Sequence, residues 1–244
     1  MNCFISGVAG ELLDLIFPPA CLVCREKSHE TICPRCRGAF EYLEDPLCSC
    51  CGGSVEVPGD SCENCLEHPP PYLLARSVFS YSGQLRQAIT GMKFHGKLQL
   101  APVLSEYLLD YIQCQRELFP GNLLIPVPSR SGSNNPGFPR FACHHIQKAT
   151  GLEYREALTL RHFIPQHRLD SRGRWENARK AFAPAQGDSI KGKRVILIDD
   201  IFTSGATAYH CSRILLDQGV LSVRVLTLAR TPPGYMSREE PDQP

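Results

Sequence analysis

Two adjacent carboxylates follow an apolar run in the stretch VILIDDIFTSGAT, residues 195–207. Four consecutive apolar residues, 195–198, are typical of a buried strand, and we expect this strand to deliver Asp199 and Asp200 to the edge of a sheet. Ligands of open parallel sheets bind beyond the carboxyl ends of the strands. A capped helix preceded by two solvated aspartates is the alternative, and it leaves the acidic pair at a strand end unexplained.

The small and hydroxylic residues that come next predict a turn leading into a helix. The unpaired N–H groups of such a turn, together with the positive end of the helix dipole, attract anions. Gly205 allows the backbone to approach an anion closely. Because the acids can accept hydrogen bonds from hydroxyl groups beside the anion, the pattern suits a phosphorylated sugar. The predicted anion-binding residues are Thr203, Ser204, Gly205, Ala206 and Thr207.

Thirteen cysteines are unevenly distributed, with ten of them between Cys3 and Cys65. Four pairs share the spacing C-x-x-C, which lets one tight turn aim two thiolates at one ion. Two such turns complete the tetrahedral sulfur shell of a structural Zn2+ site. The eight predicted metal ligands are Cys21, Cys24, Cys33, Cys36, Cys48, Cys51, Cys62 and Cys65.

We expect two zinc sites, each built from neighbouring pairs (21/24 with 33/36, and 48/51 with 62/65), although a cross-braced pairing also fits the spacing. Cys50 is left as a spare thiol. Redox-active or incidental cysteines are the alternative, and four evenly spaced pairs argue against it. A four-thiolate shell has no open coordination position, so any catalysis is expected elsewhere in the chain.

The length, net charge and apolar runs of the chain narrow the possible classes of protein. A chain of 244 residues suits one domain with a smaller attachment or two modest domains. The net charge of +1 gives no bulk attraction to nucleic acid or membrane, so any polyanion site must be local. The sequence shows no secretory signal and no apolar run near the ~20 residues of a membrane helix. We therefore expect a cytoplasmic protein with reduced thiols.

Strand and helix patterns alternate after a proline cluster at residues 68–71. This alternation predicts an α/β fold, a mostly parallel sheet with helices on both faces. The expected extended segments are 72–81, 122–128, 152–160, 194–198 and 220–228; the expected helices are 84–92, 98–114, 138–150 and 206–218; residues 161–182 are expected to form a loop. Three parts are predicted: an N-terminal helix and double zinc ribbon at 1–70, the α/β domain at 71–233, and a polar, disordered tail at 234–244.

Residues 195–207 resemble the phosphoribosyl pyrophosphate (PRPP) signature of type I phosphoribosyltransferases. With the zinc ribbon in front, the chain resembles the ComF family (ComF/GntX, competence protein F-like) over nearly its whole length. Supporting motifs are Phe17-Pro-Pro, Tyr81-x-Gly83, Met92-Lys93-Phe94, Ile125-Pro-Val-Pro128, Pro165-Gln166, Leu169, Arg174-x-x-Asn177, Ala181-Phe182 and Leu226-Thr-Leu-Ala-Arg230.

The resemblance implies a type I phosphoribosyltransferase-like parallel sheet flanked by helices. It also implies that Asp199 and Asp200 are catalytic residues that hold the ribose hydroxyls with Mg2+ nearby, and that residues 203–207 bind the 5′-phosphate. The loop after Pro128, with Arg130, would face the pyrophosphate, which a nucleophile displaces at C1 of the ribose. Natural transformation is the implied context, with single-stranded DNA and DNA-uptake proteins as partners.

The chain departs from the family pattern in the segment SRSGSNNPGFPRF, residues 129–141. An arginine-rich run ending in Arg-Gly-Phe-Asn-Gln is usual there, but Pro136 stands at the arginine and Pro139 at the asparagine. Farther on, Phe163 replaces a threonine. With fewer cations opposite the pyrophosphate, a second function stays open: a non-catalytic module with a vestigial PRPP site. It would bind nucleic acid or protein through its ribbons and the loop at 161–182, which carries six Lys/Arg and one tryptophan.

Overall fold

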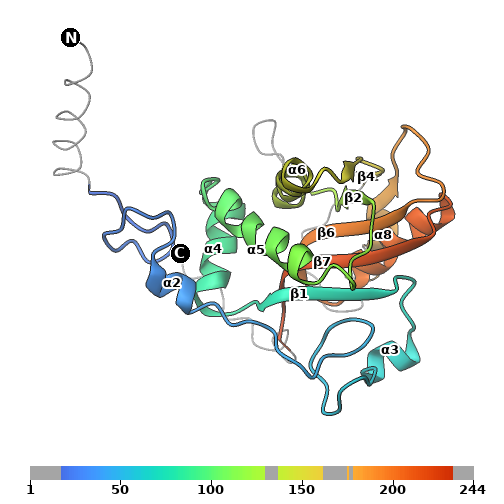
Figure 1. Ribbon diagram of the computed structural model, residues 1–244, viewed down its shortest axis with the longest axis horizontal. Coiled ribbons are helices and arrows are strands. Elements are labelled where there is room, and N and C mark those ends of the chain that lie inside the picture. Colours follow the sequence, from blue (N-terminus) through green and yellow to red (C-terminus); the bar gives the residue numbers. More distant parts are fainter. Residues whose placement is uncertain (1–17, 130–136, 162–174, 176–177, 233–244) are drawn as a thin grey trace, which may run out of the picture.

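A five-stranded parallel sheet forms the centre of the protein (Figure 1). The computed structural model describes residues 18–129, 137–161, 175 and 178–232. The strand order is β1-β7-β6-β2-β3. The strands are β1 Leu74–Ser80, β2 Leu123–Pro126, β3 Glu153–Tyr154, β6 Arg194–Phe202 and β7 Ser222–Arg230.

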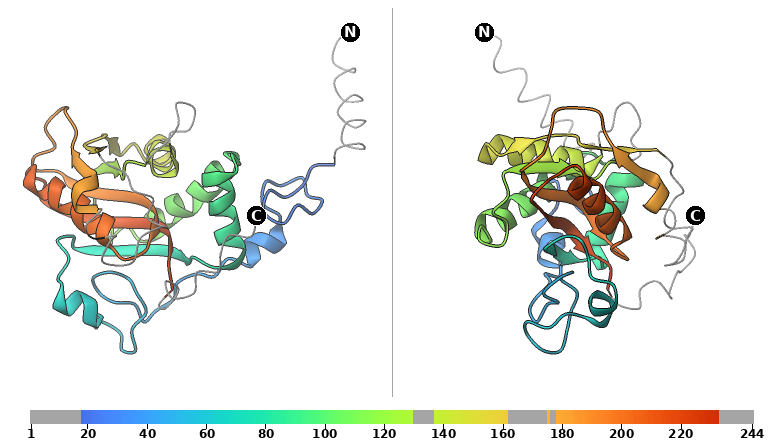
Figure 2. Two further views of the ribbon diagram at one scale, coloured as in Figure 1. Left: turned by 180° about the vertical axis from the view of Figure 1, so that it is seen from behind. Right: turned by 90° about the vertical axis from the view of Figure 1, so that its right-hand side faces the viewer.

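Helices cover both faces of this sheet (Figure 2). On one face, α4, α5 and α6 share a core with Ile196, Ile198 and Leu226, and on the other α8 packs its Cys211 and Leu215 against the sheet. Because both faces are buried, the central strand reads as a continuous apolar run. The helices are α4 Gly83–Phe94, α5 Leu100–Cys114, α6 Phe138–Thr150 and α8 Ala206–Asp217.

The two cysteine-rich ribbons pack against different parts of the molecule (Figure 1). The first contains α2 Pro34–Gly38 and shares the core that includes α4, and Lys97 Nζ donates a 2.6 Å hydrogen bond to Leu22 O. The second contains α3 Glu63–Glu67 and packs with Tyr72 and Ala75 beside β1.

The chain between the ribbons covers the outer edge of β1. Leu43 N donates to Val78 O at 3.1 Å, and Ser80 N donates to Glu41 O at 2.8 Å. Ala75 N donates to Cys50 O of the second ribbon at 2.6 Å. An exposed edge strand can pair with other chains, so the cysteine-rich part completes the sheet as well as carrying metal ligands.

Most expected elements are confirmed, and some differ from the prediction in their number or bounds. The single strand expected at 152–160 is two strands: β3 joins the main sheet, whereas β4 Leu158–Leu160 pairs antiparallel with β5 Phe182–Pro184. Tyr154 packs with the core on the α6 side and Leu158 is buried on the α8 side. The chain must therefore pass around the sheet between them.

Part of the segment expected to be a loop, 161–182, forms regular secondary structure. Residues 178–181 are helical, and Phe182 begins β5. Residues 162–174, the predicted N-terminal helix before residue 18, and the tail at 234–244 lie outside the described residues. Among the helices that are described, none combines the length and apolar character needed to span a bilayer.

Candidate functional site

The acidic pair lies inside β6, not after it. The sequence predicted that the strand would end at Ile198, but β6 continues to Phe202 because β7 pairs with it along its whole length. On its other side β2 stops at Pro126, opposite Ile198. The last residues of β6 thus extend past β2 and leave one side of the strand open at Asp199.

This open position is a switch point of the sheet topology. The helix after β2, α6, packs on one face of the sheet, and the helix after β6, α8, packs on the other. Between two such strands the following loops separate and leave a crevice, which is where ligands bind in open α/β sheets. The backbone therefore places Asp199 at the position that this fold class offers to a ligand.

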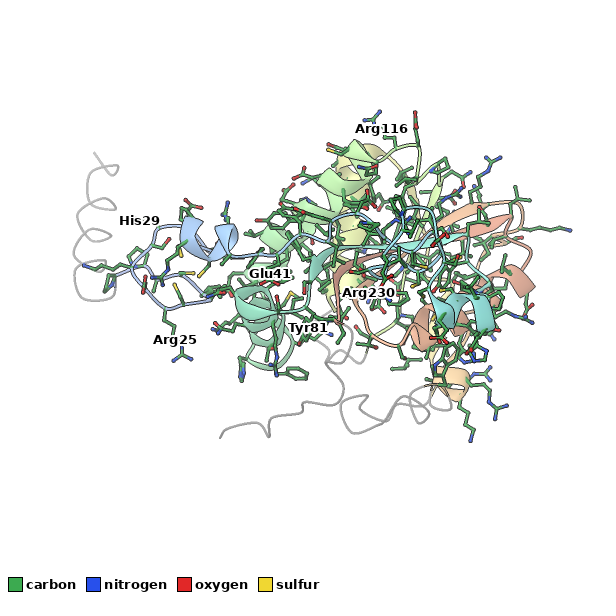
Figure 3. The ribbon with its side chains drawn as sticks, turned by 90° about the horizontal axis from the view of Figure 1, so that it is seen from below. Arg25, His29, Glu41, Tyr81, Arg116 and Arg230 are labelled. Atoms are coloured by element: carbon green, nitrogen blue, oxygen red, sulfur yellow. The ribbon has the colours of Figure 1, made fainter. Side chains whose placement is uncertain are left out.

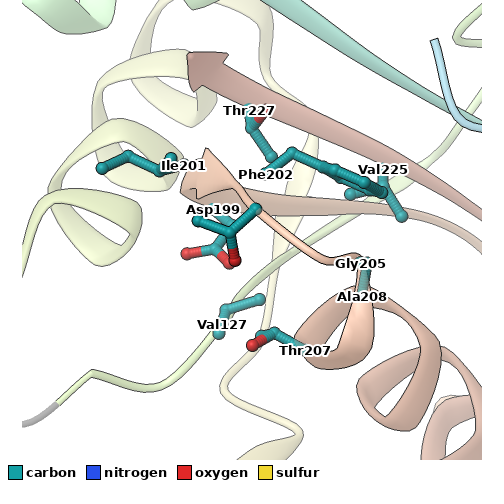
Figure 4. A pocket seen from close by; sticks show the side chains of 10 residues that line it. Val127, Asp199, Ile201, Phe202, Gly205, Thr207, Ala208, Val225 and Thr227 are labelled. Carbon is teal, nitrogen blue, oxygen red and sulfur yellow. The ribbon is translucent and has the colours of Figure 1, made fainter. Parts of the chain in front are cut away.

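A small pocket joins Asp199 to the turn before α8 (Figure 4). The carboxylate of Asp199 and the hydroxyl of Thr207 face the same hollow, with Val127 beside them. Thr203 and Gly205 also line it. The structure therefore brings four of the predicted site residues together around one space.

The turn itself has the geometry of an anion-binding helix start. Gly205 is the N-cap of α8 and has φ +80°, a left-handed conformation that favours glycine. Within the described part of the chain, the amides of Thr203, Ser204 and Gly205 donate no hydrogen bond to a protein group, whereas Ala206 N donates to Ser204 Oγ at 3.4 Å. These amides are available to a ligand at the positive end of the helix dipole.

Asp200 occupies a different position from Asp199. Its carboxylate forms a 2.6 Å ion pair with Lys93 Nζ of α4, and it is not part of the pocket lining. Successive residues of a strand point to opposite faces, so the two acids diverge. Burial disfavours the Lys93 ammonium, but its attraction to Asp200 outweighs this and raises the pKa of Lys93.

In the ligand-free protein, the surroundings of Asp199 disfavour its ionised form. Burial and the neighbouring Asp200 carboxylate raise its pKa to about 8, although Lys93 and the N–H of Asp200, which donates to Asp199 Oδ1 at 2.8 Å, oppose the rise. A hydroxyl donor or a cation placed beside Asp199 would relieve this cost. The site is therefore arranged to gain from such a ligand.

We expect Asp199→Asn to stabilise the ligand-free protein, and more so at higher pH. The folded protein retains a proton on Asp199 that an unfolded chain releases near pH 4, so wild-type stability falls as pH rises from about 4 to 8. The Asp199→Asn variant has no titrating carboxyl at this position, so its stability does not fall with pH for this reason. Between pH 6 and 8 its advantage should grow by about 1–2 kcal/mol, or roughly 2–8 °C in melting temperature.

Thermal melts of both proteins at the two pH values test this prediction. Asp188→Asn is the matched control, because Asp188 has 83% of its side chain exposed. An advantage of Asp199→Asn that stays constant across this pH range would contradict the assignment.

The eight predicted cysteine ligands form two groups of four, with the sequential pairing. In each group, all four sulfur atoms lie within 4.8 Å of one another. The Cys24–Cys33 and Cys51–Cys62 sulfur pairs are 3.8 and 3.7 Å apart, close to the ~3.8 Å edge of a tetrahedron with Zn–S bonds of about 2.3 Å. Both groups fit structural zinc. Cys50 belongs to neither group, and its sulfur lies 3.4 Å from Ser61 Oγ.

Backbone N–H groups prepare one thiol of each group for metal binding. Burial alone would raise the pKa of Cys21, but N–H donors from Cys33, Cys24 and Val23 lower it to about 6. The pKa of Cys48 is lowered to about 6 in the same way, by N–H groups of Cys62, Cys51 and Cys50. Zinc binds the thiolate form, so these N–H groups favour the ligand state of Cys21 and Cys48, whereas burial raises the pKa of Cys36 and Cys65.

One side chain links the second ribbon to the turn before α8. Arg230, labelled in Figure 3, is the last residue of β7. It donates from Nη1 to Cys51 O at 2.7 Å, and its Nη2 lies 3.4 Å from Cys51 Sγ. Its guanidinium also stacks 4.5 Å from the ring centre of Phe202. That ring packs directly under Gly205, where an added Cβ would come within 2.9 Å of it.

Sequence reasoning found some of these residues and missed others. Ser204 and Ala206 lie in the turn as predicted, while Arg130 lies outside the described residues. Lys93 and Arg230 belong to two of the sequence motifs, but the sequence predicted no role for either residue. Their charge is the signal that could have identified them. Lys93 is a cation one residue before the end of a helix, and Arg230 is a cation at the end of an apolar strand.

Comparison with known families supports the ribbon assignment. The double zinc ribbon domain family matches residues 12–66. Over most of its length the chain is similar to three named proteins. They are the DNA utilization protein YhgH of Escherichia coli K12 (28% identical, 89% of this chain and 99% of that protein), competence protein ComFC of Bacillus subtilis (25%, 84% and 86%) and competence protein F of Haemophilus influenzae (25%, 86% and 96%). The resemblance to ComF-like proteins is thus confirmed.

Two solved structures that resemble the chain overlap with part of it. A hypoxanthine phosphoribosyltransferase from Staphylococcus aureus matches 58% of this chain and 69% of its own, at 18% identity and a TM-score of 0.36. A glutamine PRPP amidotransferase from B. subtilis matches 52% of this chain at 19% identity and a TM-score of 0.37, and this chain covers 26% of it. The strand order β1-β7-β6-β2-β3, and not these overlaps, defines the fold.

Proposed function

We propose that this chain is a cytoplasmic ComF-like protein that binds PRPP and Mg2+ beside Asp199 and acts in DNA uptake or single-strand handling. The observation that carries the proposal is the pocket in which a buried-strand carboxylate faces the N-terminal turn of α8 at the topological switch point. The proteins named for competence and DNA utilization supply the biological context, through similarity that spans both the ribbons and the α/β part.

The roles of the residues follow from their chemistry. The amides of residues 203–205 and the hydroxyl of Thr207 would hold the 5′-phosphate, since they are donors at a helix start. Asp199 would accept hydrogen bonds from the ribose hydroxyls. Accepting two such bonds favours the ionised carboxylate, which offsets the burial that raises its pKa.

Magnesium fits the same place because carboxylate oxygens are the hard ligands it prefers. Asp199, the acid that lines the pocket, would hold it, and it would supply charge neutralisation for the pyrophosphate leaving group. Lys93 already neutralises Asp200 from the α4 side. The protein's own contribution to displacement at C1 would be orientation of the ribose and a fixed positive turn at the phosphate.

Calorimetric titration with PRPP and Mg2+ tests the proposal. Wild type and Asp188→Asn should bind alike, because Asp188 is a surface carboxylate. Asp199→Asn should bind at least about tenfold more weakly, the equivalent of ~1.4 kcal/mol for a lost charged hydrogen bond. Absence of wild-type binding, or equal affinity of Asp199→Asn and wild type, would refute it.

A further inference from the structure

A second pocket lies on the other side of the same turn. It encloses about 290 Å3 between the second ribbon and the start of α8, and Thr203, Ser204 and Gly205 form its floor. Neither Asp199 nor Thr207 lines it. The residues at issue here are Asn64, His68, Tyr72, Trp175, Tyr209 and Arg230, which we call the ribbon-side pocket.

Three aromatic side chains from separate parts of the chain converge on this pocket. Tyr72 follows the second ribbon and is buried, Trp175 precedes β5, and Tyr209 belongs to the first turn of α8. The rings of Trp175 and Tyr209 stand edge to face, with centres 5.2 Å apart and an angle of 66°. Both are half-buried, so they keep ring surface open to a ligand.

Polar groups surround this aromatic surface, and Cys51, Cys62 and Cys65 of the second four-cysteine group line the pocket beside it. Asn64 and His68 are exposed side chains of the second ribbon and carry hydrogen-bond donors and acceptors. Arg230 adds a positive charge. A planar ring with hydrogen-bonding edges satisfies such a surface, and the volume is close to the lower end, about 300 Å3, of small-molecule pockets. One ring system fits better than an extended ligand.

We propose that the ribbon-side pocket binds a nucleobase that stacks on Tyr209 and meets Trp175 at its edge, since the two rings stand 66° apart. The choice of a base over other planar rings rests on the proposed function, because the phosphate turn of a PRPP site forms the pocket floor. The base comes either from a small nucleoside that meets the ribose or from an unpaired nucleotide of a single strand. Base stacking on aromatic side chains tolerates any sequence, which suits handling of strands.

Trp175 offers a direct probe, because it is the only tryptophan of the chain. Wild type is titrated with oligothymidylate, with an abasic oligonucleotide of equal length and charge, and with thymidine. The emission of Trp175 should fall at least twofold with a base-carrying ligand and stay unchanged with the abasic strand. Quenching by thymidine assigns the pocket to a free nucleoside, and quenching by the strand alone assigns it to single-stranded nucleic acid.

Two variants show where the base binds. Tyr209→Ala should weaken binding of the thymidine ligand about fivefold or more, the lower end of what one stacking contact contributes. Tyr42→Ala is the matched control, an exposed tyrosine outside the pocket lining, and should bind as wild type. Equal quenching by the abasic strand, or wild-type affinity of Tyr209→Ala, would overturn the proposal.

The outcome is independent of the PRPP test. Asp199→Asn should keep the quenching, since Asp199 does not line the ribbon-side pocket. Quenching in a protein that fails to bind PRPP would refute the proposed function and leave this inference standing. PRPP binding without quenching by any base would refute this inference and leave the proposed function standing.

Discussion

Replacing Cys48 by alanine should reduce the zinc content of the purified chain from two ions to one and unfold the second ribbon. Cys48 is fully buried in a group of four thiols, and its sulfur accepts N–H donors from Cys51 and Cys62 at 3.5 and 3.2 Å. Structural zinc contributes about 10–16 kcal/mol to the folding of small ribbons. We expect the whole chain to lose at least about 3 kcal/mol, or roughly 6–12 °C in melting temperature.

Metal analysis and thermal melting of the purified protein provide the measurement. Cys50→Ala is the matched control, since Cys50 lies two residues away and outside both groups; it should retain two ions and the wild-type melting temperature. Two ions in Cys48→Ala, or fewer than one in wild type, would contradict the zinc assignment.

Gly205→Val should abolish PRPP binding and destabilise the fold. At φ +80° a side chain costs about 1–2 kcal/mol in backbone strain, and the new Cβ would come within 2.9 Å of the buried Phe202 ring. The ring cannot retreat easily, because Arg230 stacks on it. We therefore expect the turn to shift, with a loss of at least about 100-fold in affinity and about 3 kcal/mol in stability.

Two other glycines separate the effect of backbone strain from the effect of the clash with Phe202. Gly151 has φ +75° with nothing within 4 Å, so Gly151→Val reports strain alone. Gly187 has neither a positive φ nor a close neighbour, so Gly187→Val should behave as wild type. If Gly205→Val binds PRPP as tightly as Gly151→Val does, the turn is not the phosphate site.

The elements that the sequence predicted well are those with local causes. Helix α6 was expected at 138–150 and has these bounds. Gly151, at φ +75°, ends it with a left-handed cap, and Pro139, which departs from the family motif, lies in its first turn, where proline is tolerated. The four-residue apolar run likewise revealed the central strand, since burial of both faces leaves no polar position.

What the sequence could not reveal depends on contacts between distant segments. Asp200 meets Lys93 across 107 positions of the chain, and Arg230 meets Cys51 across 179. The end of β6 at Phe202 depends on pairing with β7. The ribbon-side pocket needs the second ribbon docked on the sheet, and no spacing within one segment encodes that placement.

Arg230 contacts both Cys51, a predicted metal ligand, and the Phe202 ring beneath the proposed phosphate turn. If ligand and metal each stabilise this arrangement, the coupling between their affinities is reciprocal. A molecule that fixes the Phe202 ring beneath Gly205 would also favour the contact of the Arg230 guanidinium with Cys51. Chelators should then strip the second ion less readily from an occupied protein than from an empty one, by the same factor that the ion adds to the molecule's own affinity. In a cell short of zinc, the state of this ribbon would set how much ligand the protein can retain.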